Sequence, residues 1–199
     1  MAMKKIAEGA ESDIYLTDFM GIEAVVKYRR EKPYLIPELD RQLRESRTRM
    51  EARAMHKAAS AVDVPRLLLL GKYFIVMEKV DGIAASELGG LDAKAAALAG
   101  ASLAGLHNNG IIHGDFTTAN IMVGKAGVCI IDFGLSYFSE ADEDRAFDML
   151  LIKRSISSKA YASFARAYSA NCAFSRNVFS RLRNIEMRGR YQNRSLETA

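Results

Sequence analysis

The sequence predicts an α+β fold in two parts: an antiparallel sheet that carries one long helix, and then an abbreviated helical part. Three observations lead to this prediction. Apolar runs of strand length dominate residues 3–27. A single stretch of helical periodicity follows them, and two short apolar runs come after it. Beyond residue 92 most of the chain has helical periodicity.

The first part, residues 1–80, is expected to hold the sheet and the long helix. The early strands are predicted at residues 3–7, 14–19 and 22–27. Pro33 and Pro37 interrupt the chain, and apolar residues then recur at helical spacing up to about Ala61, before Pro65. Two more short strands, 67–70 and 73–78, join at Gly71.

The second part, residues 81–199, is expected to begin at a hinge near Val80–Ala84, where Asp81-Gly82 marks a turn. An Ala- and Leu-rich helix over 92–108 has Asp92 as its predicted N-cap. A loop and two short apolar runs, 121–123 and 128–131, come next. Everything after Glu140 has a helical pattern, and the last helix carries its apolar residues on one face.

Composition excludes some classes and leaves one question open. The longest apolar runs are too short to cross a bilayer, and the N-terminus lacks the apolar run of a secretory signal, so we expect a cytoplasmic protein without a membrane partner. Cys129 lies in an apolar run and is predicted to be a core residue. Between Lys27 and Lys57 there are ten basic and five acidic residues. This excess indicates either a solvated helix face or a surface for phosphates or RNA.

The strongest chemical signal is the segment His113-Gly114-Asp115-Phe116-Thr117-Thr118-Ala119-Asn120, followed twelve residues later by Asp132-Phe133-Gly134. Phosphoryl transfer requires an oriented nucleophile and neutralised phosphate charge. Asp115 is predicted to face the acceptor hydroxyl. Asn120 and Asp132 supply the hard oxygen ligands that suit Mg²⁺.

These motifs resemble the signature set of protein kinases, which implies a bilobal protein-kinase-like fold that uses ATP and Mg²⁺. The resemblance also implies a phosphate-holding lysine on the third strand and a glutamate on the long helix. Lys27, at the end of an apolar run, and Glu51 match these positions. Glu45 is a second candidate for the glutamate, with a less suitable helical phase.

The nucleotide-covering turn and the hinge complete the expected binding site. The turn Glu8-Gly9-Ala10-Glu11-Ser12 keeps one glycine where protein kinases usually have three, and Gly9 and Ser12 are predicted to approach the phosphates. The run 74–80 resembles a kinase hinge, so the adenine is expected to bond to main chain around Glu78 and Val80. Ile6, Ile14, Met122 and Ile131 are candidate apolar walls.

Departures from ordinary protein kinases narrow the family. The catalytic loop reads His-Gly-Asp instead of His-Arg-Asp, Thr117 replaces a common lysine, and only 65 residues follow Gly134. RIO-type kinases and the kinase of the KEOPS tRNA-modifying complex share this short plan, and the chain resembles the KEOPS kinase over nearly its whole length. The matching segments are Ala7–Glu11, Val26–Arg29, Tyr34–Ala54, Val76–Glu78, the two catalytic motifs, Glu143–Asp148 and Arg188–Arg190.

The resemblance implies an atypical Ser/Thr kinase that works mainly as an ATPase and supports threonylcarbamoyl-adenosine formation on tRNA. Its implied partners are the threonylcarbamoyl-transferase subunit, to which relatives are sometimes fused, and a small subunit on the N-terminal lobe. The basic tail Arg188–Arg194 is expected near a partner or tRNA. Asp148 is expected to anchor the backbone of the catalytic loop.

Three alternatives stay open. Aminoglycoside and choline kinases also use a His-Gly-Asp loop with an Asn five residues on, but they usually have a larger helical lobe. A RIO-like kinase of ribosome maturation has the same short plan. A scaffold that has lost turnover is the third, although Lys27, Asp115, Asn120 and Asp132 are all present.

Overall fold

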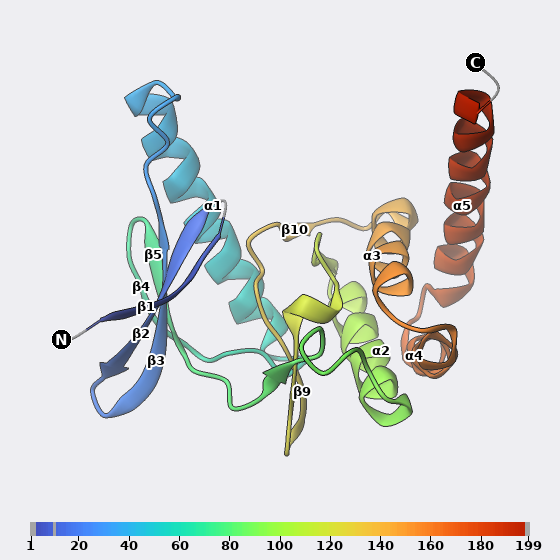
Figure 1. The fold of residues 1–199 in the computed structure, drawn as a ribbon, viewed down its shortest axis with the longest axis horizontal. Coiled ribbons are helices and arrows are strands. Elements are labelled where there is room, and N and C mark those ends of the chain that lie inside the picture. Colours follow the sequence, from blue (N-terminus) through green and yellow to red (C-terminus); the bar gives the residue numbers. More distant parts are fainter. Residues whose placement is uncertain (1–2, 10, 198–199) are drawn as a thin grey trace.

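The first part of the chain forms a five-stranded antiparallel sheet with strand order β1-β2-β3-β5-β4, shown in a computed structural model (Figure 1). The structure describes residues 3–9 and 11–197, with side chains described as far as Arg188. The strands are β1 (Lys4–Glu8), β2 (Ser12–Phe19), β3 (Ile22–Arg29), β4 (Leu67–Leu70) and β5 (Phe74–Glu78). The predicted sheet is confirmed.

Strands β2 and β3 extend two residues further than predicted, at the end where the nucleotide-covering turn lies. Their register pairs Ser12 with Arg29 and Ile14 with Lys27. The sequence pattern missed this extension because Ser12, Asp13 and Arg29 are polar, yet each is less than a tenth exposed. The pairing places the turn before Ser12 beside the charged end of β3. Ala10, in the middle of that turn, lies outside the described residues.

Helix α1 (Pro37–Ala58) is the predicted long helix, with corrected ends. Pro37 does not interrupt the chain but occupies the first helical turn, where its missing N–H costs no hydrogen bond. The helix ends at Ala58 instead of Ala61, because the amides of Ala61 and Val62 both donate to the Ala58 carbonyl and close a turn. Figure 1 shows α1 between the sheet and the helical part.

The first helix of the second part is α2 (Ala93–Asn108), whose predicted N-cap is confirmed: the Asp92 carboxylate accepts from the Ala95 amide at 2.7 Å. Two small sheets follow the order β6-β8-β9 and β10-β7. Their strands are β6 (Ile83–Ala84), β7 (Ile111–Ile112), β8 (Ile121–Gly124), β9 (Gly127–Ile130) and β10 (Tyr137–Phe138), with the short helix η1 (Thr118–Asn120) before β8.

Three helices complete the fold, as the pattern after Glu140 predicts. They are α3 (Asp142–Ser155), α4 (Ser158–Asn171) and α5 (Ser175–Glu197). The core is formed by the Ala- and Leu-rich face of α2 against α4, with Leu103, Phe164 and Tyr168 fully buried. Cys129 is buried, which confirms its predicted core position.

Among the described residues, no helix is both long and apolar enough to cross a membrane.

Candidate active site

Lys27 is the centre of a charged cluster that joins the sheet, α1 and the loop after β9. Its Nζ lies 2.7 Å from Glu51 Oε1 and 2.6 Å from Asp132 Oδ1. The Lys27 and Glu51 side chains are 7% and 1% exposed, whereas the Asp132 side chain is 49% exposed. The three residues predicted from separate motifs therefore meet, and Glu51, not Glu45, is the partner of Lys27. Glu45 pairs with Arg49 and Lys72.

Arg29 is a member of this cluster that the sequence analysis did not single out. It is buried, and its Nη2 donates to Glu51 Oε2 at 2.6 Å. Glu51 thus gives one carboxylate oxygen to Lys27 and the other to Arg29. Removing one member of such a buried pair leaves an uncompensated charge, so loss of either cation should destabilise the fold. Because side chains alternate between the two faces along a strand, Lys27 and Arg29 of β3 lie on the same face of the sheet.

The catalytic loop places Asp115 and Asn120 in direct contact. Asn120 Nδ2 donates to the Asp115 carbonyl at 2.8 Å and to its carboxylate Oδ2 at 2.9 Å. Because Nδ2 serves Asp115, the amide oxygen Oδ1 is the atom with which Asn120 can bind a metal. Asp148 of α3 fixes the start of the loop, accepting from the amides of His113 at 2.8 Å and Gly114 at 2.9 Å. Its predicted anchoring role is confirmed.

Gly114 explains why this loop has a glycine where protein kinases have an arginine. Its φ is +80°, and a Cβ built on it would lie 2.4 Å from the Leu135 carbonyl oxygen. Any side chain at this position would strain the backbone and collide with the segment after Asp132. The His-Gly-Asp sequence is therefore required by the close packing of the two loops.

Asp132 has a left-handed backbone, with φ +59°. Such a conformation is costly for a residue other than glycine and is often found at functional sites. Burial disfavours the charged carboxylate, but Lys27 outweighs burial, so the pKa of Asp132 lies below its ordinary value. A Cβ on Gly134 would lie 2.9 Å from Asp132 Oδ1 and 3.0 Å from Lys27 Nζ, so glycine leaves room for this ion pair.

Two cavities adjoin the cluster and share Lys27 and Asp132. The first, of about 520 Å³, has mainly apolar walls and includes both predicted hinge residues, Glu78 and Val80. The four predicted apolar walls, Ile6, Ile14, Met122 and Ile131, all line it. The second, of about 280 Å³, is here called the polar cavity because most of its lining residues are charged or polar, Ser12, Arg29 and Asp115 among them. Gly9 and Gly134 line it too.

The shape and chemistry of these cavities fit a nucleotide with its phosphates at the polar end. The apolar cavity suits a flat base, and the polar one holds the cations. The Asn120 amide and the Asp132 carboxylate provide the hard oxygen ligands that suit Mg²⁺. Every predicted site residue lines one of the two cavities, and Glu51 also pairs with Lys27.

Comparison with known proteins gives the family. A model of the RIO domain matches residues 13–171. The chain is also 35% identical over 218 residues to the KEOPS complex subunit Bud32 of Pyrococcus abyssi, covering 97% of this chain and 98% of that protein. This chain belongs to the Bud32 family of RIO domain proteins.

Two further matches are to longer proteins, of which this chain covers only a part. It is 38% identical over 194 residues to a probable bifunctional tRNA threonylcarbamoyladenosine biosynthesis protein of Methanothermobacter thermautotrophicus, covering 94% of this chain but only 36% of that one. The crystal structure of the Rio2 kinase-ADP/Mg²⁺-phosphoaspartate complex from Chaetomium thermophilum has a TM-score of 0.67 at 21% identity, covering 98% of this chain and 72% of that one. The latter similarity establishes the kinase fold.

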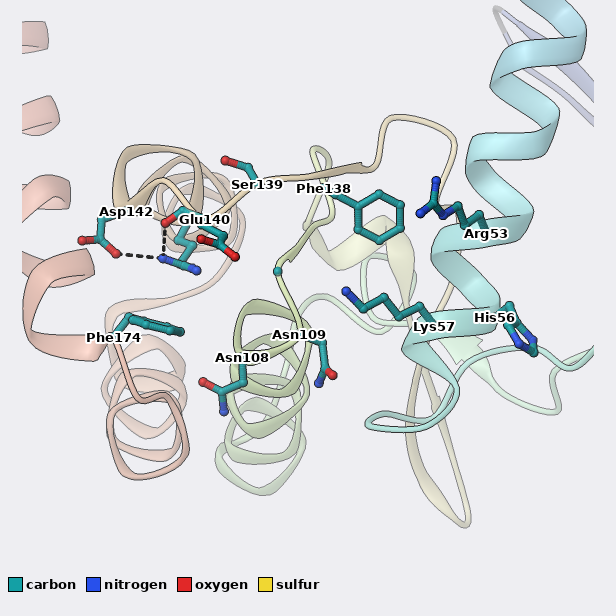
Figure 2. A pocket seen from close by; sticks show the side chains of 12 residues that line it. Arg53, His56, Lys57, Asn108, Asn109, Phe138, Ser139, Glu140, Asp142 and Phe174 are labelled. Carbon is teal, nitrogen blue, oxygen red and sulfur yellow. Dashed lines mark hydrogen bonds and ion pairs between the residues drawn. The ribbon is translucent and has the colours of Figure 1, made fainter.

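Another cavity, of about 1280 Å³, lies apart from these two, between the C-terminal end of α1 and the helical part (Figure 2). Arg53 and Lys57 of α1 lie beside the ring of Phe138 at one end of it, at 5.1 and 5.0 Å from the ring centre. Arg145 lies over the Phe174 ring and pairs with Asp142 at 2.9 Å. The arginines and the lysine that line this cavity contact aromatic rings, and none of the predicted site residues lines the cavity.

The basic tail of the chain is helical as far as Glu197. Arg188 pairs with Glu143 of α3 at 3.2 Å. The predicted contacts of Arg190 and Arg194 concern side chains outside the described ones, so the role of the tail stays a prediction.

Proposed function

We propose that this RIO domain is an ATP- and Mg²⁺-dependent phosphotransferase, an atypical Ser/Thr kinase and ATPase that acts within KEOPS to support threonylcarbamoyl-adenosine formation on tRNA. One observation carries the proposal. Lys27, held by Glu51 and Asp132, lies where an apolar cavity meets a polar cavity that also contains Asp115. This is the arrangement that phosphoryl transfer from a nucleotide requires.

The residues then have distinct roles. The main chain around Glu78 and Val80 binds the base, and Lys27 binds the α- and β-phosphates while Glu51 holds its ammonium group in place. Gly9 and Ser12 cover the phosphates. Asn120 and Asp132 hold Mg²⁺, which when bound neutralises charge on the phosphate oxygens.

Asp115 orients the acceptor hydroxyl, or water, and accepts its proton as the phosphoryl group is transferred. The bond from Asn120 Nδ2 to Asp115 Oδ2 fixes the carboxylate and leaves its other oxygen for the acceptor. The low pKa of Asp132 keeps this carboxylate ionised near neutral pH. Asp115 and Asp132 therefore act on opposite sides of the reaction, one toward the acceptor and one toward the phosphates.

The named relatives support the biological setting. The relative that matches end to end is a KEOPS complex subunit, and the longer relatives carry a name that refers to tRNA threonylcarbamoyladenosine biosynthesis. The chain spans about a third of those longer proteins, 36% of the one from Methanothermobacter thermautotrophicus. We infer that the rest of such a protein corresponds to the transferase partner. We also propose that residues 1–80 and 81–199 are the two lobes, and that a small KEOPS subunit binds the first.

ATP hydrolysis, measured with and without the transferase subunit, tests the proposal. The wild-type chain should hydrolyse ATP when Mg²⁺ is present, faster with the subunit. Asp132→Ala and Asp115→Ala should each lower turnover by about 10²- to 10³-fold. Asp18→Ala, an exposed change near the end of β2 and away from both cavities, is the matched control and should keep full activity. Unchanged turnover in folded Asp132→Ala protein would refute the assignment.

A further inference from the structure

Three cations from three different elements converge on the carboxylate of Glu11, in the nucleotide-covering turn. Arg29 of β3 lies 3.2 Å from Oε2, and Lys32, just after β3, lies 3.2 Å from Oε1. Arg47 of α1 also pairs with Oε1. None of these four residues has a role in the proposed phosphoryl transfer, although Glu11, Arg29 and Arg47 all lie in segments that resemble the family.

The cluster borders the phosphate end of the cleft through Glu11 and Arg29, and Lys32 and Arg47 lie behind them. Glu11 and Arg29 line the same polar cavity as Lys27 and Asp132. Arg29 is only 3% exposed, so its guanidinium is fixed in position by Glu51 on one side and Glu11 on the other. A planar guanidinium of this kind suits bidentate binding of phosphate.

The side chains of the cluster carry more positive than negative charge. Arg29, Lys32 and Arg47 share the single negative charge of Glu11, and the second partner of Arg29, Glu51, is already shared with Lys27. Burial disfavours the charged form of Glu11, but Arg47 and Lys32 outweigh burial and lower the pKa of its carboxyl. The Glu11 carboxylate is therefore the anion that binds these cations in the structure, and the cations keep an excess of positive charge.

We propose that Arg29, Lys32 and Arg47 form a second phosphate-binding site next to Lys27, which Glu11 occupies until a phosphate group displaces it. The inference rests on the proposed function, because it takes the adjoining cavity to be that of the nucleotide. The ligand is a phosphate group with one of two sources: the terminal phosphate of ATP, or the inorganic phosphate that hydrolysis releases. In either case Glu11 competes with phosphate for the same three cations.

The test is a set of Glu11→Gln and Arg47→Gln variants. Glu11→Gln keeps the size of the side chain but removes the competing charge, whereas Arg47→Gln removes one cation of the site. Both side chains are partly exposed, at 32% and 44%, so folding should survive and is checked by thermal unfolding. Calorimetry on the full chain with Mg²⁺ measures the affinities for ATP, for ADP, and for inorganic phosphate in the presence of ADP.

If the terminal phosphate of ATP is the ligand, Glu11→Gln should tighten ATP binding about two- to fivefold and Arg47→Gln should weaken it by a similar factor, with ADP affinity unchanged in each. If released phosphate is the ligand, the same opposite changes should be seen for inorganic phosphate and not for ATP. Glu38→Gln and Arg41→Gln remove the same charges from an exposed ion pair of α1 and should change none of these affinities.

Two results would overturn the inference. One is a Glu11→Gln variant that binds ATP and ADP more weakly by the same factor, because Glu11 would then only hold the turn in place. The other is a variant with unchanged affinity for both ATP and inorganic phosphate. Failure of the proposed function is seen separately, since a wild-type chain that binds neither nucleotide would refute it before any variant is compared.

Discussion

The cleft and the helical part both bury charged side chains, and they stabilise them differently. In the cleft, Lys27 and Arg29 are paired with Glu51 and Asp132, so each charge meets an opposite charge. In the helical part, Asp148 is fully buried and is bound mainly by neutral donors, the amides of the catalytic loop.

The difference separates charges that a ligand can use from charges that fix geometry. The cleft cluster borders two cavities, and Asp132 is half-exposed, so its ion pairs can be exchanged for contacts with phosphate and metal. Asp148 is sealed from solvent, and its other neighbour is the buried ring of His107, with 3.3 Å between Nε2 and Oδ2. Exchange there would leave buried amides without partners, which is costly.

The largest expected effect on stability is that of Asp148→Ala. The variant leaves the amides of His113 and Gly114 unsatisfied inside the protein, so it should lose about 3–5 kcal/mol of unfolding free energy. Urea unfolding measures the loss, and ATP turnover should fall as well, because the loop carries Asp115. Glu143→Ala, an exposed change on the same helix, is the control. A loss below about 1 kcal/mol would show that Asp148 does not anchor the loop.

A smaller effect is expected where the two regions meet, at Gly114. Gly114→Ala adds both a left-handed strain and a collision with the Leu135 carbonyl, and should cost about 2–4 kcal/mol. Gly89→Ala is a matched control, because Gly89 has a similar φ of +76° but nothing within 4 Å of an added Cβ. It should cost only about 1 kcal/mol. Equal losses in the two variants would contradict the close packing inferred for Gly114.

The site was largely predictable because its residues lie in short motifs with fixed spacing. Lys27, Glu51, Asn120 and Asp132 follow from the kinase-like pattern, and the structure brings them to one cleft. The expected anchoring by Asp148 was also correct. Such predictions succeed because a motif constrains residue types and positions together, which composition and periodicity do not.

The surrounding charges were not predictable, because a charged residue in a basic stretch looks the same whether it is exposed or paired. The basic segment 27–57 was interpreted as a solvated face or a phosphate surface. In the structure Arg44 is buried against Asp40 at 2.7 Å, Arg29 belongs to the cleft, and Arg41 is exposed. Only the fold shows which of these residues meet an acidic partner. The start of α1 at Pro37 was missed for a similar reason, since proline can end one element or begin another.

The smallest expected effect is on the pH dependence of stability, and it comes from His107, the buried neighbour of Asp148. Burial lowers the pKa of His107 below its ordinary value of 6.5, and the nearby Asp148 offsets this only in part. The folded chain therefore favours neutral His107, and the unfolded chain binds the proton first as the pH falls. This contribution is present in full above about pH 6.5 and is lost as the pH falls through the lowered pKa.

Urea unfolding should therefore show a loss of about 1 kcal/mol attributable to His107 between pH 6.5 and 5.5. His107→Gln removes the titrating ring, so its unfolding free energy should depend less on pH over this range, although its stability at pH 7.5 is lower than that of the wild type. His56→Gln, an exposed change on α1, should keep the wild-type slope. If His107→Gln kept that slope too, the protonation of this ring would not limit stability in acid, and the polar centre of the helical part would tolerate a charge as the cleft does.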